Sequence, residues 1–275
     1  MTLNNVSDPI GIFDSGVGGL SVLRAVWEIM PFESLIYLAD QAHVPYGPRS
    51  LEQVRAFSEG ITRYLLAQDA KLIVVACNTA SAAALHHLRQ VFPQVLFVGM
   101  EPAVKPAAER TKSGVVGVLA TPATFQGELF ASVVERFANG VTVLQDTCPG
   151  LVMEIDAGHL GTPKVRAILE RALKPMLAQG IDTVVLGCTH FPFVIPTIES
   201  IVGSGVRVID PAPAIARQVE RLLESNGLCS PEKKSNLVRY LTTGDPEKLA
   251  RLLSGLVGNT GEVQKLFWDG FILGA

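Results

Sequence analysis

Two cysteines stand at matching points of the sequence, and their surroundings indicate chemistry. Cys77 lies in the stretch VVACNTASAAAL, and Cys188 lies 111 positions later in TVVLGCTHFP. In each stretch an apolar run ends just before the cysteine, and polar residues follow. A strand-to-helix turn of this kind exposes backbone N–H groups that stabilise an anion such as a thiolate.

A lone cysteine at the end of an apolar strand is more often a core residue than a catalyst, because free cysteine is among the most buried residue types. The neighbours here favour function. Asn78 and Thr79 follow the first cysteine, whereas Thr189 and His190 follow the second and place an imidazole within its reach. Two such turns in matching positions are hard to explain by packing alone.

A carboxylate and a glycine-rich turn form a third candidate site. Asp14 and Ser15 end an apolar stretch and precede Gly16, Gly18 and Gly19. The dinucleotide motif would require glycine where Ser21 stands, and no phosphate-loop lysine follows. We therefore interpret Asp14 as a functional carboxylate at the end of a strand, because a buried carboxylate requires partners.

The elements that position these residues alternate between strand and helix patterns. Apolar strands are expected within residues 9–16, 34–40 and 70–78, and helices over 17–30 and 50–68, the latter with Ser50 as its cap. Short apolar strands separated by helices predict parallel βαβ units, whose ligands bind beyond the carboxyl ends of the strands. All the candidate residues lie at such ends.

The pattern repeats along the chain. GIFDSGVGG from Gly11 matches GVLATPATF from Gly117, and YLAD ending at Asp40 matches VLQD ending at Asp146, both with an offset of 106. The cysteine stretches match with an offset of 111. We therefore predict an α/β fold of two pseudo-symmetric parallel-sheet domains, with the active site in the cleft between them.

The last part of the chain has no counterpart in the repeat. Residues 211–227 and 245–258 are expected to be helices, the second capped by Asp245, and 237–244 a strand. Residues 262–267 are expected to end the fold as a strand. These elements most simply complete the first half.

The composition narrows the class of protein. With 275 residues, 48% hydrophobic and 18% charged, the chain has the length for a large core. A net charge of −3 without a basic stripe argues against a nucleic-acid partner. No secretory signal and no membrane-spanning run are present, so we expect a cytoplasmic protein with no membrane partner.

The residues that usually hold cofactors lack the expected patterns. Four cysteines occur without a Cys-x-x-Cys pair, and the five histidines show no metal-ligand spacing. In a reducing cytosol the cysteines should be thiols. No lysine stands at a strand end where it would form a Schiff base with pyridoxal phosphate. We predict no metal and no cofactor.

Five motifs in order carry a family resemblance. The stretches GIFDSGVGGLSVL, YLADQAHVPYG, ACNTASA, GVLATPAT and GCTHFP together resemble the aspartate/glutamate racemase group, and within it the bacterial glutamate racemases. The resemblance covers the chain from about Pro9 to Pro211. It implies a first domain built from residues 1–100 and 210–275 and a second domain over 101–209.

The resemblance also implies roles for residues of this chain. Cys77 and Cys188 would be the acid/base thiols, and Asp14 and His190 would assist them. The substrate, glutamate, would be bound by Asp14, Ser15, Tyr46, Gly47, Asn78, Thr79, Thr121, Thr189 and His190. Asp40 would contact these binding residues rather than the substrate itself.

The chain departs from the family pattern in two places. Gln41-Ala42-His43 stands where the family usually has Thr-Ala-Arg, and Asp156 stands where it usually has glutamate. The shorter carboxylate leaves two candidates to support His190, namely Asp156 and Glu154. The remaining histidines, His43 among them, are interpreted as surface or satisfied core residues.

The chemistry is consistent with the resemblance. Inverting an α-carbon requires removal of a proton from one face and return of a proton to the other, and a single base reaches both faces poorly. Two thiols that exchange roles at each turnover solve this problem. The carbanion, having no cofactor to delocalise it, requires oriented donors in a dry site.

The sequence is compatible with several alternative functions. An aspartate racemase of the same group is the runner-up, followed by a Cys-His hydrolase or amidase and by a non-catalytic amino-acid sensor. The role that the resemblance implies is the supply of D-glutamate for peptidoglycan synthesis. The sequence leaves the oligomeric state open, with a homodimer as one candidate.

Overall fold

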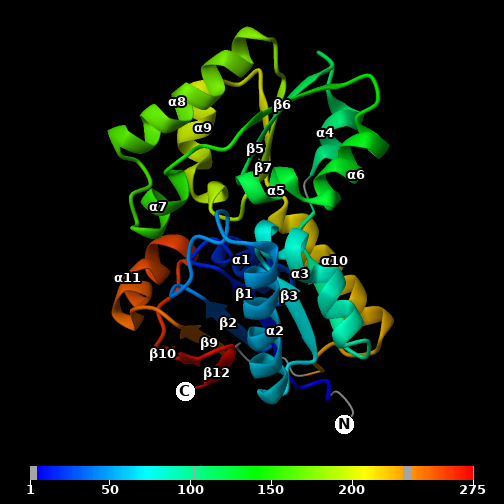
Figure 1. The fold of residues 1–275 in the computed structure, drawn as a ribbon, viewed down its shortest axis with the longest axis vertical. Coiled ribbons are helices and arrows are strands. Elements are labelled where there is room, and N and C mark those ends of the chain that lie inside the picture. The colour runs from blue at the N-terminus through cyan, green and yellow to red at the C-terminus, as the bar shows by residue number, and fades with distance from the viewer. Residues whose placement is uncertain (1–4, 102, 232–236, 275) are drawn as a thin grey trace. The chain divides into compact units, whose positions relative to one another are not determined.

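The computed structural model describes residues 5–101, 103–231 and 237–274, and the chain divides into two compact units. One unit contains the chain up to Met100 and from Ala212 onward, and the other contains Glu101–Pro211. Each unit is an α/β structure built on a parallel sheet, which confirms the predicted fold class (Figure 1).

The first unit contains a six-stranded sheet in the order β10-β9-β2-β1-β3-β4, with every neighbouring pair parallel. Its strands are β1 (Ile10–Asp14), β2 (Leu35–Ala39), β3 (Leu72–Val75), β4 (Leu96–Gly99), β9 (Val238–Thr242) and β10 (Val263–Lys265). Its helices are α1 (Leu20–Ile29), α2 (Leu51–Ala67), α3 (Asn78–Val91), α10 (Ala212–Ser225) and α11 (Pro246–Val257).

Local sequence explains where these helices begin. The Ser50 side chain accepts a hydrogen bond from the backbone N–H of Gln53, whose side chain returns to the Ser50 backbone as a capping box. Asp245 caps α11 in the same manner, with Pro246 as the first helical residue. Helix α1 begins later than predicted, because residues 15–19 form the turn that precedes it.

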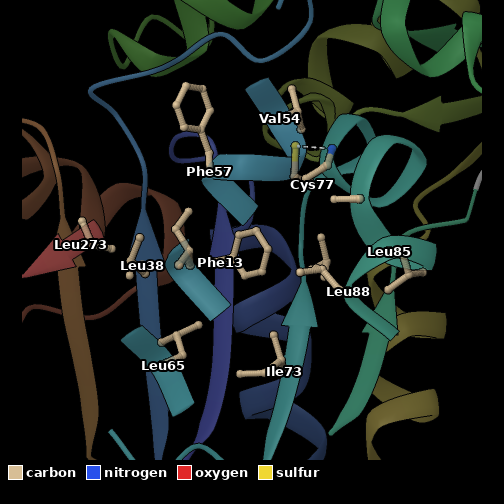
Figure 2. Packing of buried hydrophobic residues seen from close by; sticks show 14 of the residues in the cluster. Phe13, Leu38, Val54, Phe57, Leu65, Ile73, Cys77, Leu85, Leu88 and Leu273 are labelled. Carbon is tan, nitrogen blue, oxygen red and sulfur yellow. Dashed lines mark hydrogen bonds between the residues drawn. The ribbon is translucent and has the colours of Figure 1, made fainter. Parts of the chain in front are cut away.

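Helices α2 and α3 pack together on one face of the first sheet, and α1 packs against α10 and α11. Figure 2 shows the cluster beneath α2 and α3, where Phe13, Leu38 and Ile73 of the strands contact Leu65 and Leu88 of the helices. Alternate residues of β1, β2 and β3 thus face each helical layer. This packing fixes the strand ends where the candidate residues begin.

The strand predicted within residues 262–267 is present as β10, but the prediction that it ends the fold is wrong. Strand β10 ends at Lys265, and an antiparallel hairpin follows, formed by β11 (Phe267–Asp269) and β12 (Ile272–Gly274). The Asp269-Gly270 pair is a turn signal, with Gly270 at φ 59°. Three-residue strands are too short to show a pattern in the sequence.

The second unit contains a four-stranded parallel sheet in the order β6-β5-β7-β8. Its strands are β5 (Val115–Ala120), β6 (Thr142–Asp146), β7 (Thr183–Gly187) and β8 (Arg207–Ile209). Its helices are α4 (Val104–Arg110), α5 (Pro122–Gln126), α6 (Glu128–Phe137), α7 (Leu151–Asp156), α8 (Pro163–Ala178), the 3₁₀ helix η1 (Phe191–Val194) and α9 (Ile195–Val202).

The register of the two sheets confirms the predicted duplication. The order β2-β1-β3-β4 in one unit corresponds to β6-β5-β7-β8 in the other. Gly11 of β1 faces Ile73 of β3, and Gly117 of β5 faces Val184 of β7. Ile73 and Val184 are separated by 111 positions, as are the two cysteines. The cysteines therefore occupy equivalent positions in the two units.

The proposed match of Asp40 with Asp146 is wrong by two residues. The β1 glycine faces Ile36 of β2, and the β5 glycine faces Leu144 of β6, which gives an offset of 108. The counterpart of Asp40 is therefore Cys148. Asp40 directly follows β2, whereas Asp146 is the last residue of β6. The two sequence stretches therefore look alike although their aspartates occupy different positions in the sheets.

Candidate functional site

Cys77 lies at the junction of β3 and α3. It is the N-cap residue of α3, is buried, and its Sγ accepts a hydrogen bond from the backbone N–H of Ala80 at 3.5 Å (Figure 2). The partial positive charge of a helix N-terminus favours a thiolate over a thiol. The geometry therefore prepares Cys77 to hold a negative charge.

Asp14 ends β1 and is fully buried. Its Oδ2 accepts the backbone N–H of Gly19 at 2.7 Å, and the Ser15 hydroxyl lies 3.5 Å from its Oδ1 and 3.9 Å from the Cys77 sulfur. A Cβ on Gly19 would lie 2.7 Å from the Asp14 Cβ and 3.1 Å from the carbonyl oxygen of Ala76. The glycine is therefore required for the turn to close on the carboxylate.

Asn78 follows Cys77 and is only 4% exposed. Among the described residues, no group hydrogen bonds to either atom of its side-chain amide. A buried amide without partners is costly to fold and requires an explanation, and hydrogen bonds to a bound ligand would provide one. Thr79, the next residue, is also buried.

Tyr46 lies in the loop between β2 and α2, beside Gly47. Its hydroxyl donates to Oδ2 of Asp40 at 2.6 Å, and both side chains are buried. Burial first, and then the charge and hydrogen bond of Asp40, raise the pKa of Tyr46 well above its ordinary value. The charges of Cys77 and Asp14 also contribute, so these residues lie near the phenol. Tyr46 stays protonated over the physiological range.

Cys188 follows β7 in the second unit, and the imidazole of His190 lies beside its sulfur. Nδ1 of His190 lies 3.8 Å from the Cys188 sulfur, and its Nε2 lies 3.4 Å from Oδ1 of Asp156. Burial alone would lower the pKa of His190, but the Asp156 carboxylate and the Cys188 sulfur raise it well above the ordinary value. The imidazolium so produced can stabilise a thiolate at Cys188.

The two candidate carboxylates for His190 lie in different places. Asp156, the last residue of α7, is the one within ion-pair distance of the imidazole. Glu154 instead pairs with His159 at 3.1 Å and with Lys164 at 2.7 Å. Helical spacing explains the difference, because residues two apart on a helix point to different sides.

The two threonines of the second unit stand at strand ends. Thr121 follows β5 and caps α5, where its hydroxyl accepts the backbone N–H of Thr124. Thr189 lies between Cys188 and His190 and is buried. Thr121 is the counterpart of Ser15, in agreement with the predicted offset.

Cys148 is buried and has a positive φ of 44°. Burial first, then the charge and hydrogen bond of Asp146 and the charge of Cys188, raise its pKa far above the ordinary value. This thiol remains protonated and is a poor nucleophile. All four cysteines are free, and Cys229 is exposed.

Asp40 has three further hydrogen-bond partners that the sequence did not predict. His43, which we interpreted as a surface or core histidine, places Nδ1 2.9 Å from Oδ2 of Asp40. Thr243 and Trp268 donate to Oδ1, each at 2.8 Å. The departure of His43 from the family pattern was a usable signal, whereas the last fifth of the chain carries no diagnostic motif.

In the described part of the chain, no cluster of three or more histidine, cysteine, aspartate or glutamate side chains has the geometry to hold a metal ion. Among the described helices, none is both long and apolar enough to cross a membrane.

Comparison with known proteins identifies the family. A model of the Asp/Glu/Hydantoin racemase family matches residues 11–219. Glutamate racemase from Roseiflexus sp. (strain RS-1) is 51% identical over 249 residues, covering 90% of this chain and 92% of that protein. Glutamate racemase from Ectopseudomonas mendocina (strain ymp) is 49% identical over 261 residues, covering 95% and 99%.

Solved structures of glutamate racemases are also similar to this chain. Glutamate racemase isoform RacE1 from Bacillus anthracis superposes with a TM-score of 0.86 at 30% identity, covering 96% of this chain and 98% of that one. Escherichia coli glutamate racemase, in complex with L-glutamate and the activator UDP-MurNAc-ala, gives a TM-score of 0.83 at 33% identity, covering 95% and 99%. These matches confirm the resemblance carried by the five motifs, and the chain belongs to the Asp/Glu/Hydantoin racemase family.

Proposed function

We propose that this protein interconverts L-glutamate and D-glutamate by moving the α-proton between two thiols, Cys77 and Cys188. The observation that carries the proposal is the equivalent position of these cysteines at the carboxyl ends of β3 and β7, in sheets of corresponding order. Close similarity to glutamate racemases supports glutamate as the substrate.

The proton balance requires one thiolate and one thiol. The thiolate takes the α-proton of one enantiomer and becomes a thiol, and the resulting carbanion takes a proton from the opposite thiol, which becomes a thiolate. The enzyme is then ready for the other enantiomer. The proposal therefore requires both sulfurs to reach one α-carbon from opposite faces.

Each thiolate has its own stabilising group. Cys77 receives the N–H of Ala80 at the start of α3. Cys188 lies beside the His190 imidazolium, whose charge is maintained by Asp156. Either sulfur can therefore start a turnover as the base.

The proposed binding groups are side chains that have hydrogen-bond donors or acceptors available for the substrate. The Tyr46 hydroxyl donates its hydrogen bond to Asp40, so its oxygen presents lone pairs that suit the substrate ammonium. The Asn78 amide offers both a donor and an acceptor. The full set that we propose for substrate contact is Asp14, Ser15, Tyr46, Gly47, Asn78, Thr79, Thr121, Thr189 and His190.

The biological setting is part of the proposal. D-glutamate made in the cytoplasm would supply peptidoglycan synthesis, as the resemblance implies. Light scattering of the purified protein measures its oligomeric state, for which a homodimer is one candidate.

A second candidate function is favoured by one observation. Cys188, His190 and Asp156 form a chain of thiol, imidazole and carboxylate, the arrangement of a cysteine hydrolase. A hydrolase would form an acyl-enzyme on Cys188 and would not need Cys77. Mass spectrometry of the enzyme with amide and ester substrates detects such an adduct.

The deciding experiment is proton NMR of L-glutamate with the enzyme in heavy water. The α-proton signal should disappear while D-glutamate accumulates, and the Cys77→Ser and Cys188→Ser variants should both racemise about 10²–10⁴-fold more slowly. L-aspartate in the same assay tests the aspartate alternative. Retention of the α-proton by the wild-type enzyme would exclude a racemase and leave the hydrolase and sensor hypotheses.

A further inference from the structure

Asp40 is the centre of a buried hydrogen-bond cluster that joins distant parts of the chain. Its Oδ2 receives the Tyr46 hydroxyl at 2.6 Å and Nδ1 of His43 at 2.9 Å. Its Oδ1 receives the Thr243 hydroxyl and the indole N–H of Trp268, each at 2.8 Å. One oxygen thus holds the loop that carries Tyr46, and the other is held by the C-terminal segments.

The hairpin that carries Trp268 is seated on α2 by close packing. A Cβ on Gly60 would lie 2.5 Å from the carbonyl oxygen of Phe271 and 2.7 Å from the Trp268 ring. Glycine in the middle of a helix destabilises it by about 1 kcal/mol relative to alanine, so a packing reason is expected here. The packing reason at Gly60 is the hairpin, which approaches the helix so closely that no side chain fits between them.

Aromatic packing fixes the direction of the indole. The Phe57 ring stacks on His43 with centroids 3.8 Å apart, and the Trp268 ring lies 5.9 Å from Phe57 and 5.4 Å from His43. Leu273 of β12 joins the same buried cluster as Phe57 (Figure 2). The indole therefore has a defined orientation toward Asp40.

We propose that the C-terminal hairpin is a positioning element for substrate binding, in which Trp268, seated on Gly60, holds Asp40 and through it the Tyr46 hydroxyl. The inference rests on the proposed function, because it assigns Tyr46 to the substrate. A carboxylate that accepts two hydrogen bonds on each oxygen cannot rotate without breaking several of them. Loss of the indole donor removes one of the hydrogen bonds that hold Oδ1 and lets the Asp40 carboxylate and the Tyr46 loop move.

The test is a double-mutant cycle between Trp268→Phe and Tyr46→Phe. Phenylalanine keeps a ring on Gly60 and removes the N–H, so kcat/KM for glutamate should fall about tenfold, chiefly through KM, as expected for a lost bond to a charged group. In the Tyr46→Phe background the same change should have less than about a twofold effect. Phe271→Leu, which alters a ring 6.0 Å from Phe57, is the matched control and should retain wild-type kinetics.

If the losses of kcat/KM in the two single variants multiply in the double variant, Trp268 acts independently of Tyr46 and only stabilises the fold. An unchanged KM in Trp268→Phe would also overturn the proposal. If Trp268→Phe does not fold, Thr243→Val removes the hydroxyl that donates to Oδ1 and should show the same coupling to Tyr46.

A second readout separates this inference from the proposed function. The chain has two tryptophans, so the indole N–H signal of Trp268 is assigned by its loss in Trp268→Phe. Tyr46→Phe should move that signal and leave the Trp27 signal in place. If wild-type enzyme fails to exchange the α-proton yet the signal moves, the cluster exists and the racemase proposal fails. If the enzyme racemises and the signal does not move, the positioning proposal fails.

Discussion

The unpartnered amide of Asn78 leads to a prediction in which stability and activity change in opposite directions. Both amide atoms are buried without a hydrogen-bond partner among the described residues. Such a group costs about 1–3 kcal/mol of folding free energy. Asn78→Leu, which replaces the amide by an apolar group of similar size, should therefore increase the free energy of unfolding by about that amount and raise Tm by a few degrees.

Activity should fall in the same variant. If Asn78 donates to the substrate where charge develops, its loss should reduce kcat/KM about 10²–10³-fold, as for a single donor to an oxyanion. Saturating glutamate should raise the Tm of the wild-type protein through binding to the native state. It should raise the Tm of Asn78→Leu much less.

A matched control lies on α2. Ser58 is also fully buried, and its hydroxyl has no partner among the described residues, but it belongs to no candidate site. Ser58→Ala should stabilise the protein and leave kcat/KM unchanged. Differential scanning fluorimetry and the heavy-water assay measure both effects. An Asn78→Leu variant that is destabilised, or that racemises at the wild-type rate, would refute the reasoning.

The remaining predictions concern the thiols and their partners. Asp156→Asn removes the charge that raises the pKa of His190 and leaves the lowering effect of burial, so the imidazole should lose its proton at lower pH than in the wild type; NMR titration of the ring measures this, and an unchanged titration would contradict it. Cys148→Ser should leave turnover within a few-fold, whereas Cys77→Ser should reduce turnover by about 10²–10⁴-fold. Comparable losses in the two variants would contradict the assignment of Cys77 as catalytic and Cys148 as a bystander. The Haldane relation makes kcat/KM equal for both enantiomers in every variant, so sidedness must appear in isotope effects. Asp14→Asn should raise the α-deuterium effect more with D-glutamate and His190→Asn more with L-glutamate, and the reverse pattern would exchange the two sides.

Much of the fold could be predicted because its causes are local. The side chains of Ser50 and Asp245 cap the helices that follow them, and apolar runs mark the central strands. The strand-end positions of Cys77 and Cys188 follow from the same runs. In a parallel sheet, these positions already define where ligands bind.

The Asp40 cluster could not be predicted, because its members are distant in sequence. Thr243 and Trp268 are 203 and 228 positions from Asp40 and meet it only through the pairing of β9 with β2 and the packing of the hairpin on Gly60. A single sequence carries no signal for such contacts. The register error between Asp40 and Asp146 has a similar cause, since letters align without fixing which residues face each other across strands.

The two units share a backbone plan and differ in the chemistry placed on it. Asp14 at the end of β1 corresponds to Ala120 at the end of β5, and Asp40 corresponds to Cys148. A racemase needs mirror-like symmetry only at the two atoms that exchange protons, because the ammonium, carboxylate and side chain of the substrate are three different groups. Duplication can therefore conserve the strand ends that carry the thiols while most of the binding groups diverge. The different supports of the two sulfurs, a helix N-terminus in one unit and an imidazolium in the other, are the expected result.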